Sequence, residues 1–131
     1  MKSDISSRED IEVLVDTFYK KVLMDELIGH FFTDVVKLDW EKHIPVMYDF
    51  WEMVLLDKMI YHGNPMLKHI ALDKMSKLEE SHFDKWILLF SATLDELYAG
   101  PKVELAKVKN QTMKSLMLHK IKQSRGGYFI Q

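Results

Sequence analysis

The chain has 131 residues, of which 47% are hydrophobic, and a formal net charge of −2 with acidic and basic side chains interspersed. A chain of this length fits one domain, and it lacks the basic stripe with which nucleic-acid-binding proteins neutralise phosphates. No cysteine is present, which excludes disulfides, zinc–thiolate sites and iron–sulfur clusters. The totals therefore predict one globular domain, residues 1–131, that does not bind nucleic acid.

The sequence predicts neither an N-terminal signal peptide nor a membrane span. The first residues, MKSDISSREDIEV, lack an apolar signal core, and no apolar run approaches the roughly 20 residues that span a bilayer. We therefore expect a cytoplasmic protein with no membrane partner. Residues 1–7 and about 124–131, which end in SRGGYFIQ, are expected to be flexible termini.

The first helix is predicted over about residues 8–23. Ser6 and Glu9 have the spacing of a capping box, in which a serine oxygen accepts from a free amide and the glutamate reaches back. Apolar residues then recur at helical spacing: Ile11, Leu14, Val15, Phe18 and Val22. Tyr19 is expected on or near the inner face of this helix.

A corner and a second helix follow. Gly29 marks the corner, and we expect Phe31 and Phe32 to fold back from it toward the core. Asp39 is a good N-cap for the helix that begins at Trp40.

The second helix carries a histidine and a proline within an otherwise apolar pattern. Two adjacent stripes run along it, one formed by Trp40, Ile44, Met47, Trp51, Val54 and Leu55 and the other by His43, Met47, Phe50 and Val54. Pro45 falls at or just beyond the end of the first turn, where it costs little or bends the helix slightly. By this geometry His43 lies close to the inner face.

The remainder of the chain predicts a short helical piece and two long helices. Gly63-Asn64-Pro65 breaks the second helix, and residues 66–78 hold only a short piece. A third long helix is predicted over about residues 79–98, and the last over about 102–122, separated by Gly100-Pro101. No alternating strand pattern competes, so the predicted fold is all-α.

The sequence carries no signature of nucleophilic catalysis, of phosphate binding or of an HExxH-type zinc site. His43 and His69 lie on different segments that the fold could bring opposite each other. A lone inward histidine is most simply a hydrogen-bonded core side chain. However, Tyr19, His43 and Trp86 each lie on the apolar face of a separate helix, and three polar-tipped rings in one small core all need buried partners. A polar ligand bound to a metal would satisfy them together.

Four segments of the chain resemble the truncated hemoglobins, specifically their third group. They are FYKKV with Tyr19, FF with Phe32, WEKHIPVMYDFW, and HIALDKMSKLEESHFDKWILLF. The last is the most specific, since His69, Leu72, Leu78 and the run His82-Phe83-Asp84-x-Trp86 fall at the spacings of that group. The glycine pairs that mark the other two groups are missing, since the only Gly-Gly in the sequence is Gly126-Gly127 near its end. The resemblance extends over about residues 11–118.

The resemblance implies a two-over-two helical sandwich around heme (iron protoporphyrin IX). On this interpretation His69 is the metal ligand on the proximal side, and Tyr19, His43 and Trp86 line the opposite, distal side. The resemblance also places four side chains on or near the macrocycle: Phe32, Met47, Phe50 and Trp51.

Two residues depart from the family pattern, because Asp73 and Lys77 stand where we would expect histidine and proline. His82 is therefore a rival ligand to the iron. It opens a helix, whereas His69 lies in the short segment before it, and this position favours His69.

The function that the resemblance implies is the binding of dioxygen or another diatomic ligand, for gas chemistry, sensing or storage rather than bulk transport. The Tyr19 hydroxyl and the Trp86 indole N–H can each donate to a charged ligand, at roughly 1–3 kcal/mol per bond. An alternative is an enzyme that removes nitric oxide or peroxide, which would need a separate reductase because the chain has no flavin or nicotinamide signature. A third is a heme-free helical interaction module. The residues do not fix whether the protein is an enzyme, nor its oligomeric state.

Overall fold

The computed structural model describes residues 2–32, 40–58, 69, 72–73 and 77–126. This part of the chain contains four helices and no strand: α1 (Arg8–Met24), α2 (Trp40–Leu56), α4 (Glu80–Leu97) and α5 (Pro101–Gly126). The predicted all-α fold is confirmed. The predicted cap Asp39, the Gly63-Asn64-Pro65 break and most of the short helical piece lie outside the described residues.

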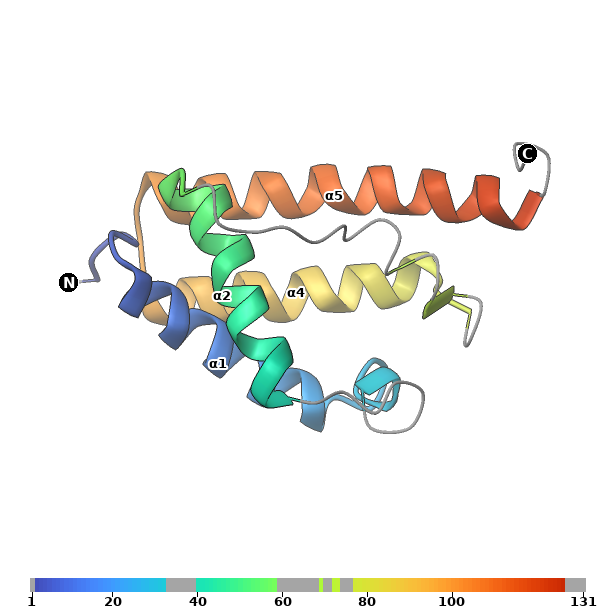
Figure 1. Ribbon diagram of the computed structural model, residues 1–131, viewed down its shortest axis with the longest axis horizontal. Coiled ribbons are helices and arrows are strands. Elements are labelled where there is room, and N and C mark those ends of the chain that lie inside the picture. Colours follow the sequence, from blue (N-terminus) through green and yellow to red (C-terminus); the bar gives the residue numbers. More distant parts are fainter. Residues whose placement is uncertain (1, 33–39, 59–68, 70–71, 74–76, 127–131) are drawn as a thin grey trace.

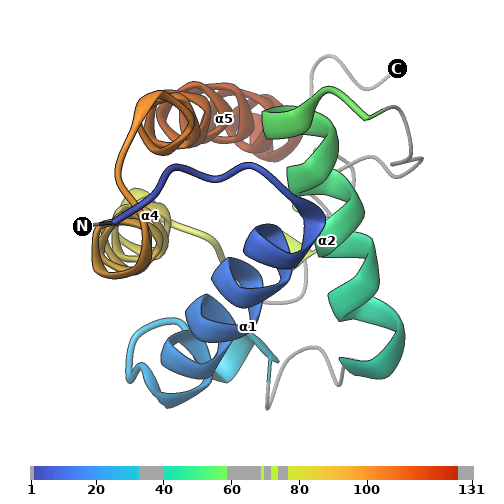
Figure 2. The same ribbon diagram turned by 90° about the vertical axis from the view of Figure 1, so that its left-hand side faces the viewer.

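The helices form two pairs. In Figure 1 α4 and α5 run side by side along the length of the molecule, and α2 crosses in front of them. Figure 2 shows α4 and α5 almost end-on, at the left and the top of the view, with α1 below them and α2 at the right. Helix α1 packs against both α2 and α4, and α5 packs against α4 and α2. No helix in the described part is long and apolar enough to cross a membrane.

Helix α1 begins with a side-chain cap that differs from the predicted one. Ser7, in an extended conformation, is the N-cap, and its Oγ accepts from the Asp10 amide at 3.3 Å. The Asp10 carboxylate in turn accepts from the Ser6 amide at 2.9 Å. The capping box predicted at Ser6 and Glu9 is therefore wrong by one residue, because each serine has an acid three positions later and the second pair fits the turn.

The segment before α1 is anchored to the start of α5. Ile5 is only 2% exposed, and the Asp4 carboxylate accepts from the Lys102 and Val103 amides at 2.9–3.2 Å. These contacts hold Asp4 and Ile5 against the helices; that residues 1–7 form a flexible terminus stays a prediction. At the other end, residues 124–126 belong to α5 and residues 127–131 lie outside the described part. That the whole chain is one domain stays a prediction.

The boundary between α4 and α5 follows the predicted break. Helix α4 ends at Leu97, and α5 starts directly at Pro101. Proline suits the first position of a helix, because the N–H that it lacks would have no partner within the helix. Helix α5 continues four residues beyond the predicted end at residue 122.

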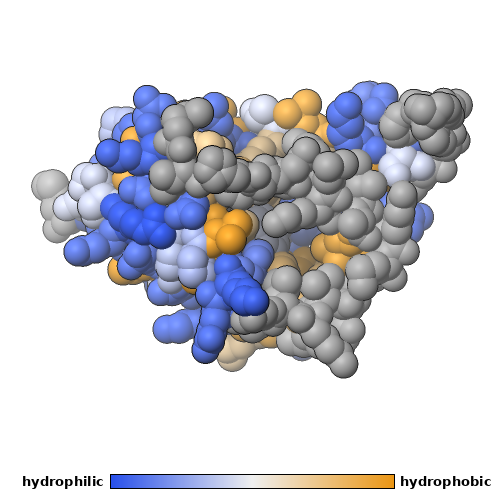
Figure 3. Space-filling view, viewed as in Figure 1, coloured by the Kyte–Doolittle hydropathy of each residue, from blue (hydrophilic) through white to orange (hydrophobic). Residues whose placement is uncertain are grey.

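The core between the helix pairs is built from aromatic and aliphatic side chains. The Phe18 ring lies at its centre, with centroids 4.7 Å from the Trp86 ring and 4.9 Å from the Phe90 ring, both edge-on. The other large side chains that are almost fully buried are Ile5, Ile11, Leu14, Val15, Val22, Leu55, Leu94, Val103 and Ile121. The outer face over α1 and α2 is mainly hydrophilic (Figure 3).

Candidate functional site

Three polar-tipped rings from three different helices meet at one place. The Tyr19 ring, on α1, has its centroid 5.6 Å from that of His43 on α2, with an interplanar angle of 81°. It lies 5.8 Å from the Trp86 ring on α4, at 76°. The structure thus brings together the three residues that the sequence singled out.

Polar atoms of two of these rings are withdrawn from solvent. Tyr19 is 6% exposed, and burial raises the pKa of its hydroxyl above the ordinary value. The hydroxyl therefore stays protonated at neutral pH and keeps its capacity to donate a hydrogen bond. The His43 Nε2 atom is also buried. The Tyr19 side chain and the His43 Nε2 atom consequently face the interior rather than water.

Phe32 reaches the cluster because the chain turns sharply after α1. The Asp25 carboxylate accepts from the Leu27 and Ile28 amides at 3.0 and 3.1 Å. At Gly29 a Cβ atom would lie only 2.6 Å from the Asp25 carbonyl oxygen, so the turn requires glycine. The Phe32 ring then lies 6.0 Å from Tyr19 and 5.8 Å from Trp86. The predicted corner is confirmed.

The apolar residues of α2 extend the site along that helix. Met47 and Phe50 are half-buried, whereas Trp51 is 6% exposed. The Trp51 ring stacks on Phe90 of α4, with centroids 4.6 Å apart and planes at 27°. Trp51 therefore also fixes α2 to α4 as a core residue.

His69 lies close to helix α4, which also carries Trp86 of the cluster. Its ring centroid lies 6.1 Å from that of Phe83 on α4, with the planes at 34°. Phe83 and Trp86 are three residues apart on α4, so they lie on the same side, separated by about 4.5 Å along the axis. Helix α4 thus presents Phe83 to His69 and, one turn later, Trp86 to Tyr19.

His82, the rival ligand, has a structural role at the start of α4. Its Nδ1 atom accepts from the Glu79 amide at 2.9 Å, and the Glu79 side chain accepts from the His82 amide in the reciprocal half of a capping box. An imidazole whose Nδ1 accepts carries its proton on Nε2, which makes it a poor ligand in this state. Burial is the main cause that lowers the pKa of His82, which favours the neutral form of the ring. This geometry favours His69 as the ligand.

The unexpected Asp73 also has a structural partner. Its carboxylate accepts from the Leu78 amide at 2.8 Å, directly before the chain enters α4. Lys77 lies within 3.6 Å of Glu79 in the same approach. The two departures from the family pattern therefore shape the entry into α4.

Two features near the cluster were not predicted from the sequence. A cleft of about 290 Å³ opens between α1 and α2, and Asp16, Tyr19, Lys20, Leu23 and Ile44 line it. Beside it, Arg8 at the start of α1 joins carboxylates of α2. The signal for the second feature was present, because a cation in the first turn of a helix opposes the helix dipole and needs a compensating partner.

Comparison with known proteins places the chain in a family. The family model described as bacterial-like globin matches residues 3–122. The chain belongs to the bacterial-like globins. This globin is 28% identical over 123 residues to the group 3 truncated hemoglobin ctb of Campylobacter jejuni, which covers 92% of this chain and 86% of the relative. It is also 35% identical over 109 residues to a group 1 truncated hemoglobin of Tetrahymena pyriformis, covering 82% and 85% of the two chains.

A solved structure agrees with these relatives. The crystal structure of group III truncated hemoglobin from Campylobacter jejuni superposes with a TM-score of 0.80 at 27% identity, covering 92% of this globin and 95% of that chain. The resemblance to the third group of truncated hemoglobins, and the two-over-two fold that it implied, are confirmed.

The residues of this globin fit the heme that its family implies. Heme iron commonly takes an imidazole nitrogen on one side, and His69 offers one from a segment of its own. Dioxygen bound to heme iron takes on negative charge and is stabilised by hydrogen-bond donors, and the buried Tyr19 hydroxyl and the nearby Trp86 indole N–H are groups of that kind. The donor set therefore suits this cofactor.

Proposed function

We propose that this globin binds heme through His69 and accepts dioxygen or another diatomic ligand on the side formed by Tyr19, His43 and Trp86. Heme supplies an iron that binds diatomic molecules reversibly. The observation that carries the proposal is the convergence of the three rings, since the His43 and Trp86 ring centroids both lie within 6 Å of that of the buried Tyr19. The relatives are named as truncated hemoglobins, which supports the same assignment.

The distal residues have distinct parts in this proposal. Tyr19, protonated at neutral pH, donates from α1, and the Trp86 indole N–H donates from α4. Hydrogen bonds to a charged partner contribute about 1.5–3 kcal/mol each, so two donors hold a charge-bearing ligand firmly. His43 forms the α2 wall of the site and lies edge-on to Tyr19.

The apolar residues around these donors keep water out and face the cofactor. Phe32 lies against both Tyr19 and Trp86, and Met47 and Phe50 extend the apolar surface along α2. Excluding water strengthens every electrostatic contact inside the site. Several donors in a dry site predict slow ligand release, which suits gas chemistry, sensing or storage better than bulk transport.

An absorption spectrum tests the proposal directly. The purified protein, supplied with hemin, is reduced and then exposed to carbon monoxide. We expect an intense Soret band that sharpens and shifts when carbon monoxide binds. A protein that stays colourless with added hemin would overturn the proposal and favour a heme-free helical module.

A second assay separates ligand binding from enzymatic turnover. Nitric oxide consumption by the oxygenated protein is followed over repeated additions, with and without an external reducing system. A binding protein reacts once per site. Sustained consumption only with the reductant would assign catalysis with a separate reductase.

A further inference from the structure

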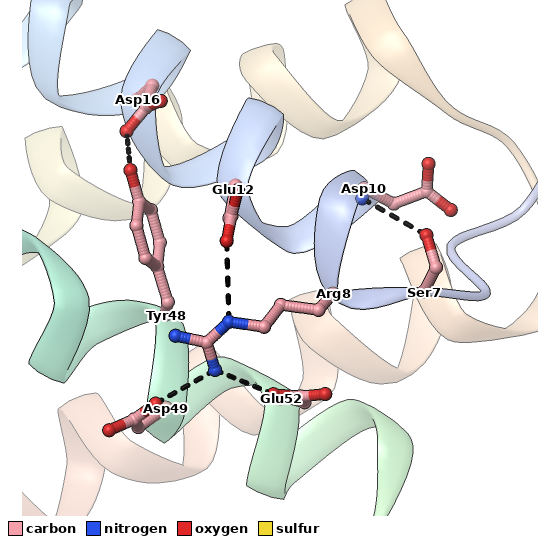
Figure 4. Close-up of polar contacts among 8 residues, drawn as sticks. All are labelled: Ser7, Arg8, Asp10, Glu12, Asp16, Tyr48, Asp49 and Glu52. Atoms are coloured by element: carbon pink, nitrogen blue, oxygen red, sulfur yellow. Dashed lines mark hydrogen bonds and ion pairs between the residues drawn. The ribbon is translucent and has the colours of Figure 1, made fainter.

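One guanidinium group links the start of α1 to the second half of α2. Arg8 Nη1 donates to Asp49 Oδ1 and to Glu52 Oε1, each at 2.8 Å, and Arg8 Nε donates to Glu12 at 3.3 Å (Figure 4). The Glu52 side chain is only 11% exposed, so its carboxylate depends on this partner. The hydrogen bonds to Asp49 and Glu52 raise the pKa of Arg8 further, so the cation is permanent.

A tyrosine makes the second link between the same helices. The Tyr48 hydroxyl on α2 donates to the Asp16 carboxylate on α1, as Figure 4 shows. The Arg8 guanidinium carbon lies 5.6 Å from the centre of the Tyr48 ring. Arg8 therefore contacts the tyrosine of the second link as well as the carboxylates of the first. We call Arg8, Tyr48 and their carboxylate partners Glu12, Asp16, Asp49 and Glu52 the polar clamp.

The charges of the polar clamp are unevenly balanced. The clamp contains four carboxylates and one cation: Arg8 pairs with Glu12 on α1 and with Asp49 and Glu52 on α2, whereas Asp16 accepts from Tyr48. Without Arg8, carboxylates of the two helices would repel one another across their interface. The spacing of α1 and α2 therefore depends on this residue more than an isolated surface ion pair would suggest.

The polar clamp lies next to the candidate site. Asp16 precedes Tyr19 by three residues on α1, and Ile44 precedes Tyr48 by four on α2, so each pair lies on one side of its helix. Asp16, Tyr19 and Ile44 all line the cleft of about 290 Å³ between the two helices. The Tyr48–Asp16 link therefore borders the opening beside Tyr19.

The part of α2 that carries His43 depends on the part that the clamp holds. Pro45 lies inside α2 and lacks the N–H that would otherwise bond to the Glu41 carbonyl. This loss weakens the first turn, which includes His43. The second half of α2 is fixed by the clamp and by the Trp51–Phe90 stack. The first turn is therefore coupled, through the body of α2, to the segment that the clamp holds.

We infer that Arg8 and Tyr48 are positioning residues of the distal site: the polar clamp holds α2 on α1 and thereby fixes His43 against Tyr19. This inference rests on the proposed function for its effect on ligand entry. Its structural part, that the His43–Tyr19 contact depends on Arg8, does not require that the protein binds heme.

The test compares Arg8→Leu, Arg8→Lys and Tyr48→Phe with a matched control, Lys21→Leu. Lys21 also forms an ion pair from α1, but with Glu96 on α4 at 2.9 Å, so its loss leaves the α1–α2 contact intact. Three readouts are taken on the purified protein with bound heme and carbon monoxide. They are amide hydrogen exchange over residues 47–50, the nuclear Overhauser contact between the Tyr19 and His43 rings, and the rate constant of carbon monoxide rebinding after photolysis.

We expect Arg8→Leu to raise exchange over residues 47–50 about tenfold, since a charge-assisted link between the helices is lost. The ring contact should weaken, and carbon monoxide rebinding should speed up by about threefold or more as the wall formed by His43 loosens. Tyr48→Phe should act in the same direction, Arg8→Lys should restore part of each effect, and Lys21→Leu should leave all three readouts near wild type.

Two results would overturn the inference. One is exchange in Arg8→Leu and Tyr48→Phe that matches Lys21→Leu. The other is raised exchange with an unchanged ring contact and rebinding rate, which would give the clamp a merely structural role. If Arg8→Leu fails to fold, the same three readouts in Tyr48→Phe and Arg8→Lys test the inference. If the protein binds no heme, the proposed function fails, while exchange and the ring contact in the heme-free protein still test the clamp.

Discussion

The Tyr19 and His43 rings lie 5.6 Å apart, edge to face, although one belongs to α1 and the other to α2. The contact joins two residues that are far from each other in the sequence, and Trp86 of α4 adds the third side. Such convergence of polar-tipped rings in a buried place requires tertiary packing of three helices. It is therefore the feature on which functional predictions for this globin depend.

Removing the two distal donors should speed the release of dioxygen. We expect Tyr19→Phe combined with Trp86→Phe to raise the dissociation rate constant at least about tenfold, because about 1.4 kcal/mol of lost hydrogen bonding corresponds to that factor. The rate is measured by stopped-flow replacement of dioxygen with carbon monoxide. Tyr98→Phe is the matched control, since the Tyr98 hydroxyl donates to the Asp10 carbonyl at 3.0 Å. Equal rates in all these variants would rule out the distal donors.

His82 should matter for stability and not for the iron. Replacing His82 by alanine removes half of the capping box of α4, and we expect a loss of about 1 kcal/mol in the free energy of unfolding. Urea unfolding at about neutral pH measures it, with the exposed His119→Ala as control. If His82→Ala changed the heme spectrum of the folded protein, this would instead indicate that His82 is a ligand to the iron.

The contribution of His82 should also depend on pH. Burial is the main cause that lowers its pKa below the ordinary 6.5, while Glu79 opposes the shift and His30 adds to it. Because the pKa is lower in the folded state, the unfolded chain binds the proton more readily. The stabilisation is therefore complete above about pH 6.5 and is lost as the pH falls through the folded-state pKa. His82→Ala should reduce the difference in unfolding free energy between about pH 7.5 and pH 5; an unchanged difference would contradict this.

The anchoring of the N-terminus gives a prediction about α5. Asp4→Ala should lower the free energy of unfolding by about 1–2 kcal/mol, because the Lys102 and Val103 amides lose the carboxylate that caps them. Thermal and urea unfolding measure the loss, and the exposed Glu26→Ala is the control. Gly100→Ala should be destabilising as well, since Gly100 has φ of +146° and a Cβ there would lie 2.5 Å from Asp4 Cγ. Wild-type stability in both variants would show that the anchor contributes nothing.

The helices and their inner faces were predictable because they depend on local periodicity. The spacing of Ile11, Phe18 and Val22 predicted α1 almost to the residue, and Gly100-Pro101 located the break before α5. The convergence of Tyr19, His43 and Trp86 was also predicted, since each lies on an apolar face and a small all-α domain has one interior.

The features that the sequence did not predict depend on contacts between distant residues. Asp4 caps a helix that begins almost one hundred residues later, and nothing near Asp4 indicates that partner. Arg8 finds Asp49 and Glu52 only after α2 folds across α1. The choice of Ser7 over Ser6 as N-cap depends on backbone angles that two equivalent local patterns could not distinguish.

The central claim is that His69 is the ligand through which this globin holds heme iron, and its exchange for glycine tests this most directly. The absorption spectrum of the reduced His69→Gly protein is recorded with and without added imidazole, alongside His82→Gly. We predict that His69→Gly loses the Soret band of the wild type, that free imidazole restores it, and that His82→Gly keeps it. A wild-type spectrum in His69→Gly without imidazole would contradict the account.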